Sequence, residues 1–228
     1  MNWFTNAITS SLGRKLIMSL TGLFMIAFLV IHLMGNLQLL YNDGGEHFNL
    51  YALFMTTNPF IKTISYLLYI SILIHAIQGI IIWRQNKLAR GIRYLARNNE
   101  MTTFASRNMV GLGVVIFVFI VIHMWQFWFQ MKIGALDLLE YPGYDQLVKD
   151  LYTPVAIAFS KWYFVVFYVF CMIIIAFHLN HGFQSAFQTL GLIHRKYTPV
   201  IEWLGRTYSI IIPLGFACIP VYFFFSNR

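Results

Sequence analysis

Five long apolar stretches, separated by polar and turn-rich links, run along this chain. They cover approximately 16–40, 60–83, 109–131, 162–187 and 204–225. Each has about 20 or more mostly apolar residues, the length that an α-helix needs to cross a hydrocarbon core of about 30 Å. Glycine and proline punctuate the links, and the link 41–59 has room for a short interfacial helix. The pattern predicts an all-α, polytopic membrane protein with five transmembrane helices in a bundle.

The composition agrees with this interpretation. The chain has 228 residues, of which 59% are hydrophobic and 11% are charged, whereas about a quarter of the residues of a soluble domain are charged. Five spans and their links use the whole length, so we expect residues 1–228 to form a single transmembrane domain. No room remains for a soluble domain that binds flavin or nucleotide. The two cysteines are too few for an iron–sulfur cluster and are expected to be packing residues.

The basic residues predict the orientation in the membrane. Of the 16 Lys and Arg residues, eleven lie on the side of the N-terminus and five on the other side. Because Lys and Arg accumulate on the cytoplasmic side, we expect the N-terminus to be cytoplasmic and the C-terminus to lie outside. This topology accounts for the net charge of +8 without nucleic acid. If a soluble partner docks on the cytoplasmic face, the basic stretch 84–107 is where we expect it.

One histidine lies in each of the first four apolar stretches: His32, His75, His123 and His178. Ionisable side chains at membrane depth are costly and usually functional. At a rise of about 1.5 Å per residue, His32 and His123 lie about 21–24 Å from the cytoplasmic face, and His75 and His178 about 6–8 Å from it. The four therefore form two levels about 15 Å apart, which pair His32 with His123 and His75 with His178.

Paired imidazoles are the axial ligands that a six-coordinate b-type haem needs. The two levels therefore predict two stacked b haems inside the bundle. Gly79 and Gly182 each follow an inner histidine by four residues, where a missing side chain would let a flat macrocycle approach the helix. Two alternatives remain open at this point. The histidines could be hydrogen-bonded packing residues or a proton relay, and His181 could replace His178.

Short motifs in fixed order carry a family resemblance. They are Ser19-x-Thr21-Gly22 and His32-x3-Asn36 in the first stretch, His75-x3-Gly79, Ile122-His123-Met124-Trp125, and His178-x3-Gly182-x8-Gly191. With these residues the chain resembles the single-chain, five-helix, di-haem cytochrome b subunits of succinate dehydrogenases and fumarate reductases. More narrowly, it resembles the b558-type membrane anchor of succinate:menaquinone oxidoreductase, over nearly its whole length. The spacing of the last motif favours His178 over His181 as the ligand.

The resemblance implies roles for these residues. His75 and His178 would hold the proximal haem, His32 and His123 the distal haem, and Ser19 would contact a haem propionate. It also implies a flavoprotein subunit that carries FAD and an iron–sulfur subunit on the cytoplasmic face of a bacterial cytoplasmic membrane. The chain alone is not expected to act on succinate. Where some fumarate reductases have a proton-conducting glutamate, this chain has Ala176, as expected for the succinate-oxidising branch.

Menaquinone reduction is expected near the outer face, where the sequence offers several polar residues. Asn36 and Glu46 are the first candidates for the quinone site, and Gln38, His47 and Gln126 are further ones, although helix-end or interfacial roles also explain each of them. Two other functions fit parts of the pattern. The chain could be the cytochrome b anchor of another respiratory complex, of the hydrogenase, formate dehydrogenase or nitrate reductase type. It could also be a haem-free transporter with a histidine relay.

Overall fold

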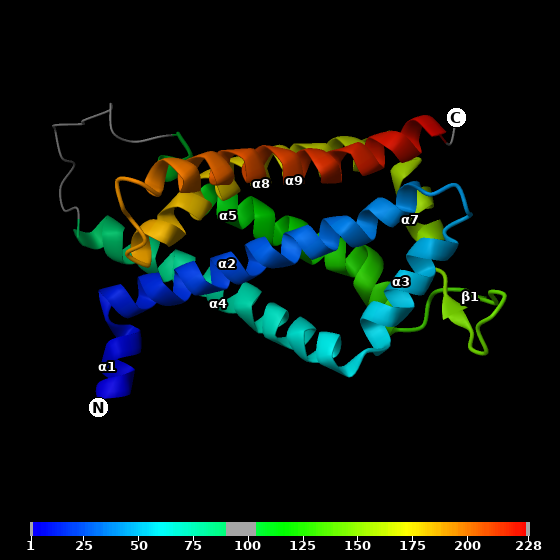
Figure 1. Ribbon diagram of the computed structural model, residues 1–228, viewed down its shortest axis with the longest axis horizontal. Coiled ribbons are helices and arrows are strands. Elements are labelled where there is room, and N and C mark those ends of the chain that lie inside the picture. Colours follow the sequence, from blue (N-terminus) through cyan, green and yellow to red (C-terminus); the bar gives the residue numbers. More distant parts are fainter. Residues whose placement is uncertain (1, 90–103, 227–228) are drawn as a thin grey trace. The chain divides into compact units, whose positions relative to one another are not determined.

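The computed structural model describes residues 2–89 and 104–226, and five long helices dominate it (Figure 1). They are α2 (Ser11–Asn36), α4 (Pro59–Ala89), α5 (Phe104–His123), α8 (Trp162–Thr189) and α9 (Thr198–Ser226). By length and composition, all five are able to cross a membrane. The prediction of a helical protein with five candidate spans is therefore confirmed. Helices α4, α8 and α9 extend beyond the predicted apolar stretches, whereas α2 and α5 end inside them, where a 3₁₀ turn and a π-helical segment follow.

Shorter elements occupy the links and the chain start. They are α1 (Trp3–Thr9), the 3₁₀ turn η1 (Leu37–Leu40), α3 (Glu46–Thr57), the π-helical segment η3 (Met124–Phe129), α6 (Gln130–Lys132), β1 (Leu138–Leu139), β2 (Val148–Lys149) and α7 (Tyr152–Phe159). Helix α3 is the short helix expected in the link 41–59. The strands pair antiparallel, with Leu138 opposite Lys149. Two-residue strands leave no periodic signal in a sequence, so this hairpin was not predicted.

The chain divides into two compact units, and each long helix contributes residues to both. The first unit contains residues 1–27, 68–116 and 174–210. Close backbone approach holds it together: a Cβ at Gly205 of α9 would lie 2.7 Å from the Phe183 ring of α8. Tyr208 of α9 donates a hydrogen bond of 2.5 Å to the Ile26 carbonyl of α2. Small residues and hydroxyl groups are what pack helices against each other when lipid surrounds them.

The second unit contains residues 28–67, 117–173 and 211–228. Here α2 and α9 meet where a Cβ at Gly215 would lie 2.8 Å from Leu33. The core is aromatic: Tyr168 packs edge-on against Phe119 and Phe159, at ring-centroid distances of 5.2 and 5.0 Å. Such edge-to-face pairs are favourable arrangements of aromatic rings. They bring α5, α7 and α8 together in this unit.

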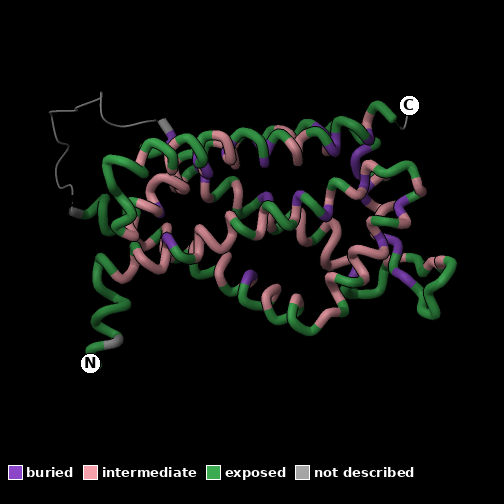
Figure 2. Tube along the Cα trace, in the orientation of Figure 1, coloured by how far each residue is buried: buried purple, intermediate pink, exposed green. Residues whose placement is uncertain are grey.

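Large apolar side chains are exposed on all five long helices. Figure 2 shows that most helix positions are exposed or only partly buried. Leu20, Ile70, Val118, Phe170 and Leu214 are each exposed by more than a third. Soluble proteins do not expose so much apolar surface in one place, whereas helices that face lipid do. The burial pattern thus agrees with a multi-pass membrane protein.

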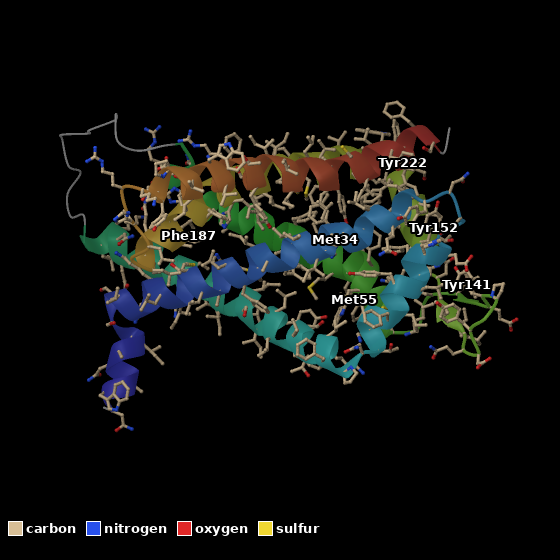
Figure 3. The ribbon with its side chains drawn as sticks, in the orientation of Figure 1. Met34, Met55, Tyr141, Tyr152, Phe187 and Tyr222 are labelled. Atoms are coloured by element: carbon tan, nitrogen blue, oxygen red, sulfur yellow. The ribbon has the colours of Figure 1, made fainter. Side chains whose placement is uncertain are left out.

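Asn49 of α3 ties this helix to the link between α5 and α8. Its side chain is fully buried. Its amide nitrogen donates to the Tyr141 hydroxyl and to Asp150 Oδ1, and its oxygen accepts the backbone N–H groups of Leu151 and Tyr152. Tyr141 and Tyr152 both lie beside α3 (Figure 3). One buried amide therefore fixes the end of the hairpin and the start of α7.

We predict that Asn49→Ala destabilises the protein by about 1–3 kcal/mol, because several buried polar groups lose their partner. Thermal unfolding of the detergent-purified chain measures this. Asn42→Ala serves as the matched control, since Asn42 is exposed in the neighbouring link. Equal melting temperatures for the two variants would contradict the role assigned to Asn49.

Candidate functional site

The four intramembrane histidines meet in two pairs. In the first unit, His75 of α4 faces His178 of α8, with ring centroids 6.3 Å apart and ring planes at 63°. In the second unit, His32 of α2 faces His123 at the end of α5, with centroids 5.9 Å apart and planes at 86°. We call them the 75/178 pair and the 32/123 pair. The partners are those that the sequence places at equal depth.

The spacing of the rings fits axial ligation of an iron. Two imidazoles that bind one metal from opposite sides through bonds of about 2.0–2.1 Å have centroids roughly 6–6.5 Å apart. The 75/178 pair lies within this range and the 32/123 pair just below it. Directly hydrogen-bonded imidazoles could share this spacing, but no hydrogen bond joins the rings of either pair in the described residues. The chemistry of the donor set, two imidazoles for each metal, is that of a b-type haem.

Glycines from neighbouring helices face the 75/178 pair. A Cβ at Gly22 of α2 would lie 3.3 Å from His75 Cε1, and a Cβ at Gly113 of α5 would lie 3.7 Å from His178 Cε1. The missing side chains leave both rings accessible from the side of the neighbouring helix. Gly113 was not singled out in the sequence because no spacing relates it to a histidine on its own helix.

The two glycines expected to make room for a macrocycle face methionines instead. A Cβ at Gly79 would lie 3.4 Å from Met18 Cε, and one at Gly182 would lie 3.7 Å from Met109 Cε. Methionine side chains are unbranched and flexible, so these neighbours are able to rearrange around a bound group. The role of Gly79 and Gly182 at a cofactor stays a prediction.

The polar neighbours of the 75/178 pair differ between its two rings. Thr21 Oγ1 lies 3.2 Å from His75 Nδ1, and the Met18 backbone is a second hydrogen-bond partner of His75. His178 Nδ1 is buried and has no hydrogen-bond partner among the residues that the structure describes. A buried nitrogen without a partner is costly, and it marks this ring as one whose environment is incomplete in the protein alone.

Aromatic rings enclose the 32/123 pair. Phe28 stacks on His32 with a centroid distance of 5.1 Å, and Phe216 lies 5.5 Å from the same ring. Phe119 and Phe127 lie 5.8 and 5.5 Å from His123. This apolar shell excludes water from both imidazoles and creates a surrounding of low polarity. Such a shell is one of the factors that set the reduction potential of a bound metal.

Polar groups reach the 32/123 pair at two points. Tyr168 Oη lies 3.4 Å from His123 Nδ1, and the same hydroxyl donates to Gln126 Oε1 at 2.8 Å. Asn36 Nδ2 lies 3.4 Å from His32 Nδ1 and donates to the His32 carbonyl at 2.7 Å. Asn36 and Gln126, two of the quinone-site candidates, thus lie beside this pair. Tyr168 was not predicted, because an aromatic residue inside a span gives no signal of its own.

Several other predicted residues lie apart from the histidine pairs. The buried Ser19 hydroxyl donates to the Lys15 carbonyl of its own helix, so its contact with a propionate stays a prediction. Glu46 lies in the first turn of α3, and within residues 2–89 and 104–226 its carboxylate has neither a hydrogen bond nor an ion pair. Gln38 lies in the 3₁₀ turn that follows α2. His181 follows His178 by one helical turn and is half-buried.

Asp43 and His47 form a polar pair where α3 begins. Asp43 Oδ1 accepts the Gly45 N–H, and Oδ2 accepts the His47 N–H, both at 2.9 Å, and His47 Nδ1 also bonds Oδ2. Burial raises the pKa of Asp43, but the hydrogen bonds from His47 and Gly45 outweigh it, so the pKa lies below its ordinary value of 3.8. The Asp43 carboxylate therefore caps α3 in its charged form. His47 is 65% exposed, which leaves it open to water.

Among residues 2–89 and 104–226, no group of three or more His, Cys, Asp or Glu side chains lies close enough together to hold a metal ion. A haem iron with two histidine ligands does not need such a group, because it takes only two protein side chains. In the basic stretch 84–107, residues 90–103 lie outside the described ranges.

Comparisons of the chain with known protein families, curated proteins and solved structures gave no match.

We predict a pH dependence from the Asp43 cap. Because the folded-state pKa of Asp43 is lowered, its stabilising contribution is fully present above pH 3.8 and is lost as the pH falls through the lowered pKa. Thermal unfolding of the wild type and of Asp43→Asn measures this. The wild type should melt at a higher temperature at neutral pH, and the difference should shrink once the pH falls below 3.8. A difference that persists unchanged in strong acid would refute the charged cap.

Proposed function

We propose that this protein is the membrane anchor and electron-transfer subunit of a succinate:menaquinone oxidoreductase. In this proposal it relays electrons from a cytoplasmic iron–sulfur subunit through two bis-histidine b haems to menaquinone. The observation that carries the proposal is the pairing of four intramembrane histidines, with ring centroids 6.3 and 5.9 Å apart. The resemblance of the short motifs to a known family is the basis for proposing this particular complex.

The histidines and their neighbours are suited to hold the two cofactors. His75 and His178 would clamp one haem from α4 and α8, and His32 and His123 would clamp the other from α2 and α5. Haem, when bound, supplies reversible one-electron transfer. The protein residues keep the imidazoles opposed, and the phenylalanines around the 32/123 pair keep water away. Nδ1 of His178 is buried and has no hydrogen-bond partner in the described residues, so the protein alone does not fix the tautomer of this ring.

The two soluble partner subunits and menaquinone are also part of this proposal. The flavoprotein subunit with FAD would oxidise succinate, and the iron–sulfur subunit would dock on the cytoplasmic face, near the basic stretch 84–107. Menaquinone would bind on the other side of a bacterial cytoplasmic membrane. Asn36 beside His32 and Glu46 in α3 are the first residues to test there. The exposed His47, bonded to Asp43, is a suitable proton donor for the same side.

The optical spectrum of the purified chain tests the proposal. A dithionite-reduced minus oxidised spectrum should have the sharp α-band of b-type haem, and haem extraction should yield two haems per chain. A spectrum without this band would favour the haem-free transporter. The purified complex should also contain a flavin-bearing subunit and reduce a menaquinone analogue with succinate. If the chain instead co-purifies with a hydrogenase, formate dehydrogenase or nitrate reductase subunit, the assignment to succinate oxidation is wrong.

Single substitutions test the pairing. We predict that His75→Ala and His178→Ala each lower the haem content from two to one per chain and remove the same haem from the redox titration. His32→Ala and His123→Ala should each remove the other haem. The physical reason is that a six-coordinate haem loses its stable ligation when one axial imidazole is missing. If His75→Ala and His123→Ala removed the same haem while the folded chain persists, the pairing would be wrong.

The two glycines of α5 provide a steric test with an internal control. We predict that Gly113→Leu lowers the occupancy of the 75/178 haem several-fold, because position 113 faces His178 and a large side chain there would occupy the space beside the ring. Gly111→Leu should have no such effect, since nothing lies within 4 Å of a Cβ at position 111. Haem per chain, measured for both variants, gives the comparison. Equal occupancy in the two variants would show that position 113 does not border the haem.

A further inference from the structure

We propose that Thr21 and Tyr168 are positioning residues. Thr21 fixes the tautomer of His75 in the 75/178 pair, and Tyr168 fixes the tautomer of His123 in the 32/123 pair. Their hydroxyl oxygens would hold a hydrogen on Nδ1 of His75 and of His123, so that Nε2 of each ring carries the free lone pair that binds iron. The inference rests on the proposed function. It adds two residues to which neither the motifs nor the spacing of the histidines assigns a role.

The Tyr168 hydroxyl can only accept a hydrogen bond from His123. A tyrosine hydroxyl has one hydrogen to donate, and Tyr168 donates it to Gln126 Oε1 at 2.8 Å. The same oxygen lies 3.4 Å from His123 Nδ1. It is therefore left with only lone pairs for the imidazole, and the hydrogen in this contact must come from His123. Tyr168 is buried, so water does not compete for the oxygen.

The position of Gln126 makes this arrangement specific. Gln126 lies in the π-helical segment Met124–Phe129, which starts directly after His123. π-helical turns are rare, and they often lie at functional sites because they re-aim side chains relative to the preceding α-helix. Here the wider turn presents a carbonyl oxygen to Tyr168 from the helix that also carries His123. Gln126 thereby selects the direction of the Tyr168 hydroxyl.

Thr21 repeats the arrangement at the other pair. Its hydroxyl donates to the Ile17 carbonyl at 2.7 Å, with the Met18 carbonyl as a second acceptor at 3.1 Å. Its oxygen lies 3.2 Å from His75 Nδ1. With its hydrogen committed to its own helix, Thr21 is left to accept from His75. The Met18 backbone also bonds His75, so this ring has a second partner that remains when the hydroxyl is removed.

The opposite ring of each pair has no hydroxyl acceptor in the described part of the chain. His178 Nδ1 has no partner there, and the neighbour of His32 Nδ1 is the Asn36 amide nitrogen, itself a donor. Each pair thus combines one ring that the protein orients in advance with one that it does not. Donation from Nδ1–H makes an imidazole a stronger base and a better ligand for the oxidised metal. Removing the acceptor should therefore raise the reduction potential of the haem that this ring holds.

Crossed isosteric substitutions test the inference in the purified holoprotein. Redox titration of the haem α-bands gives the two midpoint potentials, and the His75→Ala and His123→Ala variants show which potential belongs to which pair. Tyr168→Phe should raise the reduction equilibrium constant of the 32/123 haem by up to about tenfold, which is about 59 mV for a one-electron couple, and leave the other unchanged. Thr21→Val should raise only the potential of the 75/178 haem, and by less, because the Met18 backbone remains.

Further variants serve as controls. Thr21→Ser keeps the hydroxyl and should retain the wild-type potentials, and so should Tyr163→Phe, which removes a more exposed hydroxyl from the same helix as Tyr168. If Tyr168→Phe does not keep its haems, Gln126→Met is measured in its place. This substitution removes the acceptor of the Tyr168 hydroxyl hydrogen, so the hydroxyl no longer has to accept from His123, and the potential of the 32/123 haem should rise. Unchanged potentials in the loaded variants, or equal shifts of both haems, would overturn the inference. A wild-type chain without haem would instead refute the proposed function itself.

Discussion

The cost of placing an imidazole in hydrocarbon governs how this protein is built. A polar ring that cannot bond to water must find a partner inside the protein or in a bound group. Four of the five candidate spans carry such a ring, and the chain brings the rings together in two facing pairs. The helices around them supply what the rings need: glycines that leave the 75/178 pair accessible, phenylalanines that enclose the 32/123 pair, and hydroxyl groups at Nδ1. These features account for one another if each pair holds a metal between its rings.

The same helices serve two different purposes along their length. Toward lipid, the five long helices present Leu, Ile, Val and Phe, and this surface needs no specific sequence. Toward each other, they place small residues such as Gly205 and Gly215 where backbones approach closely. Outside the spans, polar side chains take over: Asn49 fixes the hairpin link with four hydrogen bonds, and Asp43 caps α3. The contacts that stabilise the links and the residues around the histidine pairs are thus separate, so each can be mutated on its own.

Much of this arrangement could be predicted from the sequence, for identifiable reasons. Apolar length gave the five candidate spans, and turn residues on both sides of the link 41–59 left room for α3. The depth of each histidine gave its partner, because the rise of an α-helix is fixed. The hairpin and the π-helical segment were not predicted, since two-residue strands and a single widened turn leave no periodic pattern. The short helix α7 was not predicted either. Gly113 and Tyr168 were missed for another reason: their importance depends on which side chain of another helix they face, and no spacing within one helix contains that information.

The proposed function has one structural requirement, which is that two irons lie in the membrane, one between His75 and His178 and one between His32 and His123. Anomalous diffraction at the iron absorption edge, from crystals of the purified complex, tests it most directly. We expect two peaks within the part of the density that belongs to this chain, each lying between the Nε2 atoms of one pair. A single peak, or an iron bound by any other residue of the chain, would contradict the account.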